Sequence, residues 1–100
     1  MFVMLIALCF IFASDCCVAM TAREKAERNA RGQIRSPGRA HLGGISNGTH
    51  EGVGYGSSAR DALASCCYTG RRKYRCTDSA VVQGPRGGWY AVKQFIYRRR

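Results

Sequence analysis

Alternation of large and small side chains marks the C-terminal half of the chain. Residues 50–56 alternate glycine with larger residues in the period of a β-strand. Residues 89–97 form a longer apolar run that also fits a strand, and a shorter run at 80–83 precedes it. Residues 84–88 are glycine- and proline-rich and form a turn, so the last two runs predict an antiparallel hairpin.

Glycine occupies every second position of the first predicted strand, at Gly52, Gly54 and Gly56. A strand that lacks side chains on one face is usually approached closely by another group. We expect an aromatic ring, that of Trp89 or Phe95, to lie across these glycines. The alternative is a ligand in contact with the bare backbone.

A helical period follows the first strand. Small and apolar side chains recur at the spacing of one helical face, at Ala59, Ala62, Leu63, Cys66 and Cys67. Ser58 and Asp61 resemble an N-terminal capping box, and Gly70 is the predicted stop. The order strand–helix–strand–strand predicts a small α+β domain over residues 50–97. Its three-stranded antiparallel sheet carries one helix packed on a face.

The pattern between residues 20 and 49 is weaker. Thr21 and Glu24 form a predicted capping box, and Gly32 is expected to end a short helix as a left-handed cap. The only apolar stripe of this helix consists of alanines, so we expect it to bury little surface and to be marginal. Residues 32–49 contain five glycines and are predicted to be a linker or an extended surface segment.

The N-terminus begins with an uninterrupted apolar run. Phe2–Ala13 is twelve residues long, which is shorter than the roughly 20 residues of a membrane span and matches the apolar region of a secretory signal. Residues 1–19 are therefore a predicted signal peptide, and the protein is expected to be secreted or periplasmic. Two alternatives remain open: residues 2–20 anchor the protein in a membrane, or Met20 is the true start of a cytoplasmic protein.

Charge adds a preference for partners. The chain has 16 Lys and Arg against 6 Asp and Glu, a formal net charge of +10. This excess favours an anionic partner, such as a cell-wall polymer, an acidic lipid surface or an acidic protein, with nucleic acid less favoured. The residues expected to contact anions lie in a basic loop and in the basic tail 98–100: Arg71, Arg72, Lys73, Arg75, Arg98, Arg99 and Arg100. The residues expected to stack on a ligand are Tyr74, Trp89 and Tyr90.

The cysteines predict a stabilising disulfide bridge. A bridge from Cys76 to Cys67, or to Cys66 in its place, would close a loop of about ten residues and stabilise the domain by roughly 2–3 kcal/mol.

The cysteines, together with His41 and His50, match no zinc spacing, and no set of nucleophile, base and orienting group can be assembled. We expect no cofactor, no metal and no enzyme activity. The best function is a small exported basic binding module, and the alternative is a nucleic-acid-binding module that uses arginines and sheet aromatics.

Several short motifs fall within residues 50–97. They are Glu51-Gly-Val-Gly, Ser57-Ser58-Ala59, Cys66-Cys67-Tyr68-x-Gly70, Val81-Val82-x-Gly84 and Gly88-Trp89-Tyr90-Ala91. Together they resemble small exported bacterial proteins of uncharacterised function. The resemblance implies export and the strand–helix–strand–strand order, and it implies no activity and no site.

Overall fold

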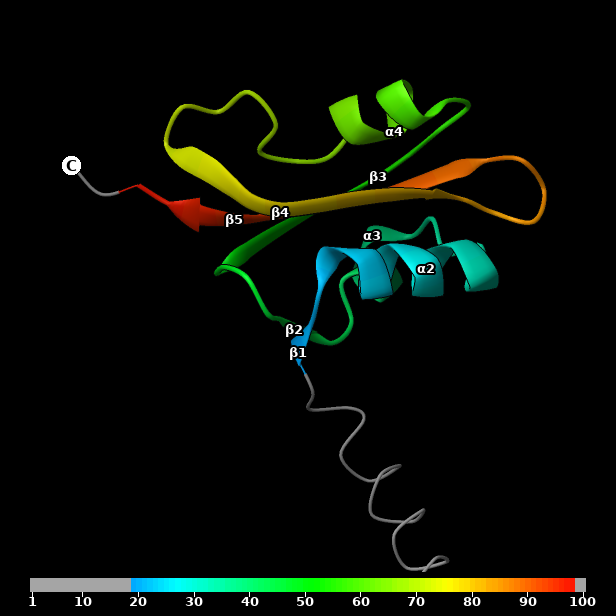
Figure 1. Ribbon diagram of the computed structural model, residues 1–100, viewed down its shortest axis with the longest axis horizontal. Helices are drawn as coiled ribbons and strands as arrows, with labels where there is room; N and C mark the ends of the chain where they lie inside the picture. The colour runs from blue at the N-terminus through cyan, green and yellow to red at the C-terminus, as the bar shows by residue number, and fades with distance from the viewer. Residues whose placement is uncertain (1–18, 99–100) are drawn as a thin grey trace, which may run out of the picture.

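A three-stranded antiparallel sheet with helices on both faces forms the body of the protein (Figure 1). The computed structural model describes residues 19–98, so the predicted signal segment Phe2–Ala13 and the tail residues Arg99 and Arg100 lie outside it. The elements in chain order are β1 (Ala19–Met20), α2 (Ala22–Gly32), α3 (Pro37–Ala40), β2 (Gly44–Ile45), β3 (His50–Gly56), α4 (Ala59–Ala64), β4 (Tyr74–Gln83) and β5 (Trp89–Tyr97). The short strands β1 and β2 pair in parallel beside the sheet.

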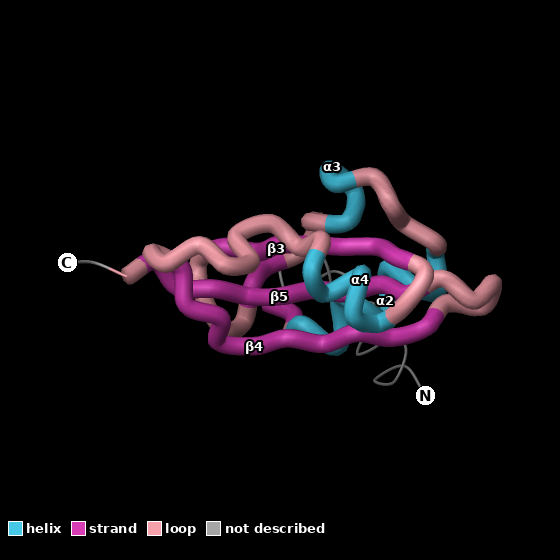
Figure 2. The backbone as a smooth tube through the Cα atoms, turned by 90° about the horizontal axis from the view of Figure 1, so that it is seen from above, coloured by secondary structure: helices cyan, strands magenta, loops and turns pink. Residues whose placement is uncertain are grey.

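Strand β5 is the centre of the sheet, with β3 on one side and β4 on the other (Figure 2). The predicted strands 50–56 and 89–97 and the hairpin turn are confirmed. The second strand is longer than the predicted 80–83, because it begins at Tyr74 and pairs along the whole of β5. A bulge between Cys76 and Asp78 shifts the register of this strand, so side-chain alternation changes phase there and hides the strand in the sequence.

Helix α2 packs on one face of the sheet, so the prediction that it buries little surface is wrong. Ala22 and Ala26 are fully buried against Val92 of β5, with Val53 beside them. Alanine adds little apolar area of its own, but its small side chain lets the helix lie close to a valine-covered sheet. The fold therefore has a helix on each face, where the sequence predicted one helix on a single face.

The N-terminal cap of α2 is the predicted one, whereas its C-terminal cap lies one residue later than predicted. The predicted capping box is present: Thr21 Oγ1 accepts a hydrogen bond from the Glu24 amide at 3.1 Å, and Glu24 Oε1 accepts one from the Thr21 amide at 2.8 Å. The left-handed residue at the other end is Gln33, with a φ of 50°, and Gly32 is still helical. The prediction of a cap at Gly32 was therefore one residue early.

Helix α4 packs on the opposite face and is shorter than expected. Ser58 Oγ accepts a hydrogen bond from the Asp61 amide at 3.1 Å, so the predicted helix start is correct. The helix ends at Ala64, although the apolar period continues to Cys67. After the helix, Cys66 still enters the core at 3 % exposure, whereas Cys67 is exposed.

The glycine face of β3 is covered by backbone, so the expected aromatic ring is not there. A Cβ atom at Gly54 would overlap the Ala62 carbonyl oxygen, and one at Gly52 would lie 2.8 Å from the Cys67 nitrogen. The chain of α4 and of the turn after it therefore rests directly on the strand. Ser65 strengthens this contact, since its Oγ lies 3.2 Å from the Tyr55 amide and accepts its hydrogen bond.

A buried ion pair fastens the predicted linker to the domain. The Lys25 side chain of α2 is fully buried, and its Nζ donates hydrogen bonds to the carbonyls of His41 at 3.3 Å and Gly43 at 3.1 Å. Nζ also lies 3.0 Å from each carboxylate oxygen of Glu51, although only Oε1 has hydrogen-bonding geometry. His41 Nδ1 lies 2.9 Å from the same Oε1. The segment before β3 is thus held by side-chain contacts.

Candidate anion-binding site

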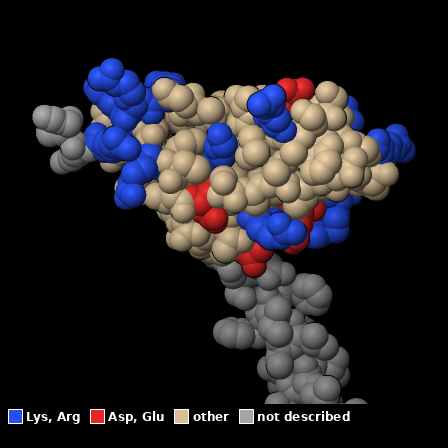
Figure 3. Space-filling model, turned by 45° about the horizontal axis from the view of Figure 1, so that its top comes forward, with Lys and Arg blue, Asp and Glu red and all other residues tan. Residues whose placement is uncertain are grey.

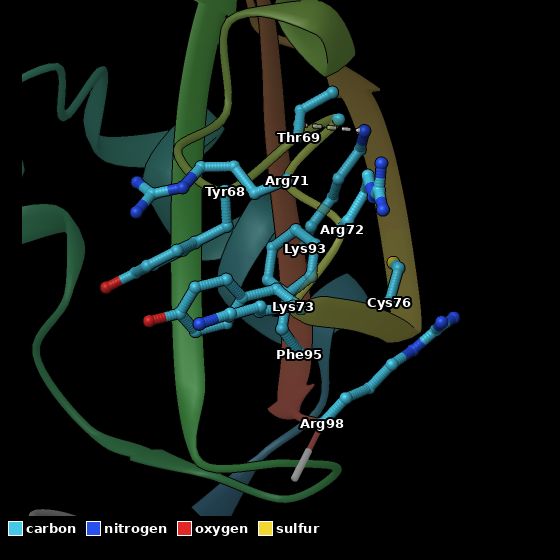
Figure 4. Close-up of a pocket in the computed structure, with 11 residues that line it drawn as sticks. Tyr68, Thr69, Arg71, Arg72, Lys73, Cys76, Lys93, Phe95 and Arg98 are labelled. Carbon is cyan, nitrogen blue, oxygen red and sulfur yellow. Dashed lines mark hydrogen bonds between the residues drawn. The ribbon is translucent and has the colours of Figure 1, made fainter. Parts of the chain in front are cut away.

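A hollow of about 800 Å³ lies at one end of the sheet, on the face that α4 covers (Figure 4). The loop between α4 and β4 folds over this end, from which the C-terminus leads, and the β4–β5 turn lies at the far end (Figure 1). We call this space the basic hollow. Its walls are the loop residues 68–74 together with Cys76 of β4, Lys93 and Phe95 of β5, and Arg98.

Aromatic rings form the floor of the basic hollow. Phe95 is buried at 2 % exposure, and the ring of Tyr68 lies 5.6 Å from it between centroids. Tyr74 lies 4.4 Å from Tyr68, and His50 meets both tyrosines edge-on at 5.1 and 5.5 Å. Such contacts hold rings in fixed orientations, so the floor is preorganised.

Backbone strain at Tyr68 accompanies this packing. Tyr68 has a φ of 69°, in the left-handed region that a bulky side chain rarely occupies. Such a conformation costs of the order of 1–3 kcal/mol and persists only when surrounding contacts compensate for it. The ring of Tyr68 packs against Phe95 and Tyr74 and lines the hollow.

Five cationic side chains surround the aromatic floor: Arg71, Arg72, Lys73, Lys93 and Arg98. Within the described part of the chain, no acidic side chain lines the hollow. Lys and Arg gather at this end of the molecule on the surface that Figure 3 displays. Like charges this close raise the local electrostatic potential, which attracts anions.

Two of these cations have fixed positions. Lys93 is half-buried and donates a hydrogen bond from Nζ to Thr69 Oγ1 at 3.1 Å (Figure 4). The guanidinium of Arg71 lies over the rings of Tyr74 and Tyr68, at 5.5 and 5.7 Å from their centroids. Cation–π contact of this kind orients the group without neutralising its charge, so Arg71 remains able to pair with an anion.

The structure describes eight of the residues predicted to contact anions or to stack, and it brings five of them together. Arg71, Arg72, Lys73, Arg98 and Tyr74 all line the basic hollow. Arg75 is exposed, but it pairs with Ile96 and so lies on the opposite face of the sheet.

Two of the predicted stacking residues lie elsewhere. Tyr90 is buried at 3 % exposure on the α2 face, so it is not accessible for stacking. Trp89 packs at the far end of β5 against the cluster formed by Ala62, Cys66 and Ala91. Trp89 is distant from the loop along β5, and Tyr90 points to the other face because successive residues of a strand alternate.

Sequence reasoning missed Lys93 as a functional candidate. A signal for it was present, since it is the only charged residue in the apolar run 89–97. It is two positions from Phe95 and therefore on the same face of the strand. Tyr68 gave no such signal, because its role depends on a left-handed backbone that the sequence did not suggest.

The predicted disulfide is not formed in the structure, where Cys66, Cys67 and Cys76 are all free thiols. The Cys66 thiol is in the core and donates to the Ala62 carbonyl at 3.6 Å, whereas Cys76 Sγ donates to the Asp78 carbonyl at 3.4 Å. Burial raises the pKa of the Cys66 thiol to about 11, against the opposing effect of the Lys93 ammonium. Cys66 is therefore protonated at neutral pH and is a poor nucleophile.

Metal-binding clusters and membrane-spanning helices are two further features that would bear on function within residues 19–98. No group of three or more His, Cys, Asp or Glu side chains in this range is arranged to hold a metal ion. None of the helices in the described range is long and apolar enough to cross a membrane. No protein-family model, curated protein or solved structure gives a significant match to the chain.

Proposed function

We propose that this protein is a small binding module for an anionic polymer, rather than an enzyme, and that the basic hollow is its binding site. The observation that carries the proposal is the set of five cations around an aromatic floor, with no acidic side chain of residues 19–98 in the lining of the hollow. Arginine and lysine on a loop and a strand can follow a chain of negative charges. A polymer gains from several weak contacts at once, which suits an open hollow.

Removing the loop charges tests the site. The triple variant Arg71→Gln, Arg72→Gln, Lys73→Gln is expected to bind long-chain polyphosphate about 100-fold more weakly at low salt. Each basic residue near an anionic surface contributes about 1 kcal/mol, and about 1.4 kcal/mol is a tenfold change in affinity. Titration at several salt concentrations is the measurement, and the wild-type affinity should fall more steeply with salt than that of the variant.

A second triple variant controls for net charge. Arg39, Arg60 and Arg86 are exposed residues outside the hollow, and their side chains make no hydrogen bond or ion pair to another residue within 19–98. Changing all three to Gln removes the same charge, and we expect less than a fivefold loss of affinity. Equal losses in the two triple variants would mean that net charge, and not the basic hollow, drives binding.

We also infer that the module works outside the cytoplasm, as a secreted or periplasmic protein. The support is the apolar run Phe2–Ala13, together with the way Met20 is held. The Met20 carbonyl accepts a hydrogen bond from the buried Gln94 side chain at 2.8 Å, so cleavage after Ala19 would keep this contact. Intact mass of protein taken from its host should equal that of residues 20–100; full-length protein in the cytoplasm would contradict export.

A further inference from the structure

A second hollow, of about 420 Å³, shares four lining residues with the basic hollow. It is lined by Tyr97 and by the loop residues 71–74, which also line the first hollow. The two hollows thus share three basic side chains and the aromatic side chain of Tyr74. A ligand that follows the loop contacts both.

The rings along this path are regularly spaced. The centroids of Tyr68 and Tyr74 are 4.4 Å apart, and those of Tyr74 and Tyr97 are 5.3 Å apart. Tyr97 pairs directly with Tyr74 across the two strands and is 45 % exposed. Its exposed surface is available to a planar group of a ligand.

The cationic side chains and the exposed tyrosine ring together indicate which class of anionic polymer fits the site. A polymer that carries only charge, such as polyphosphate, would use the arginines and leave the exposed ring without a partner. Single-stranded nucleic acid uses both features, because its phosphates pair with cations while its bases stack on aromatic side chains. A duplex fits less well, since its bases already stack on one another and α4, at six residues, is too short to enter a groove.

We propose that the two hollows and Tyr97 form a binding path for single-stranded nucleic acid. A base stacks on the exposed ring of Tyr97, and Arg71, Arg72 and Lys73 contact the phosphates on either side of Tyr74. Arg71 already lies over a tyrosine ring, so its guanidinium can also stack on a neighbouring base. This inference rests on the proposed function, because it assigns a ligand to the same basic site.

Binding of the full chain to a fluorescein-labelled 12-mer of thymidine nucleotides tests the proposal, with fluorescence anisotropy as the measurement. The comparison probe is an abasic 12-mer with the same number of phosphates. We expect the thymidine oligomer to bind at least tenfold more tightly than the abasic oligomer.

The variant Tyr97→Leu is expected to bind the thymidine oligomer about tenfold more weakly than the wild type, the loss typical of one stacked base. Its affinity for the abasic oligomer should stay within twofold of the wild-type value. Tyr97→Phe, which keeps the ring, should retain the wild-type affinity.

Tyr55→Leu is the matched aromatic control. Tyr55 is 38 % exposed and has the guanidinium of Arg35 over its ring at 4.3 Å, but it lies near the far end of the sheet, where Gly56 pairs with Trp89. We expect this variant to bind the thymidine oligomer as the wild type does. A loss equal to that of Tyr97→Leu would overturn the assignment of the path.

The remaining outcomes separate this inference from the proposed function. Equal affinity for the thymidine and abasic oligomers would overturn the nucleic-acid assignment and leave an anionic-polymer module. Binding only to vesicles of phosphatidylglycerol, with no binding to either oligomer or to polyphosphate, would overturn both proposals in favour of a membrane surface. No binding to any of these probes would also overturn both.

Discussion

Replacing Glu51 with glutamine is expected to lower the free energy of unfolding by about 3–5 kcal/mol. The change leaves the Lys25 ammonium fully buried without its anionic partner, and the loss of one member of a buried ion pair typically costs this much. Lys25→Met should have a similar effect, because it leaves the Glu51 carboxylate buried and also removes the donor to His41 and Gly43. Urea unfolding measures the change.

A double variant of the buried pair and a variant of an exposed ion pair are the controls for the Glu51 substitution. Combining Lys25→Met with Glu51→Gln should cost less than the sum of the single changes, since no unpaired charge then remains. Arg23 and Glu27 form an exposed pair at 3.2 Å on the same helix, and Glu27→Gln should cost only about 0.3–0.5 kcal/mol. If Glu51→Gln were as mild as Glu27→Gln, the buried pair would not hold the segment before β3.

Replacing Gly54 with alanine is expected to cost about 3 kcal/mol or to displace α4 from the sheet. The added methyl group would overlap the Ala62 carbonyl oxygen and come close to Ser65 Oγ. Overpacking of this kind costs about 1–3 kcal/mol, and here the obstacle is backbone, which cannot rotate away. Urea unfolding gives the loss of stability.

Gly38→Ala is the control for this substitution. A Cβ at Gly38 has no neighbour within 4 Å and its backbone is not left-handed. That change should be neutral or should stabilise slightly, because alanine restricts the unfolded chain more than glycine does. Equal effects of the two substitutions would show that α4 does not rest on the glycine face of β3.

These two expectations concern stability, and they are separable from binding. Lys25, Glu51 and Gly54 lie outside the basic hollow, whereas Arg71, Arg72 and Lys73 are exposed and contribute little to the core. A variant of the loop should therefore keep the fold while losing affinity.

The local parts of the fold could be predicted from the sequence. The strands 50–56 and 89–97, the turn between the last two strands and the caps at Thr21 and Ser58 all depend on side chains close together in the chain. The part of the site on one loop was predictable for the same reason. Arg71, Arg72, Lys73 and Tyr74 are consecutive, so any fold that exposes the loop keeps them together.

The errors concern contacts between distant parts of the chain. The alanine face of α2 was visible in the sequence, but its partner is the valine surface of a sheet formed more than twenty residues later. The glycines of β3 indicated a close approach without indicating whether a ring, a ligand or a backbone would fill it. The cysteine spacing suggested a bridge, but the early end of α4 placed Cys66 and Cys76 in separate environments.

Local spacing and turn chemistry predicted the chain order strand–helix–strand–strand, the final hairpin, the starts of α2 and α4 and a loop of consecutive cations, whereas the central place of β5 in the sheet was not predicted. Long-range packing places α2 on the second face of the sheet and brings Lys93 and Phe95 beside the basic loop. Those positions depend on the antiparallel register of β4 and β5, which pairs Tyr74 with Tyr97 and Cys76 with Phe95. Register depends on the burial of whole faces, and a pattern read along one strand does not contain it.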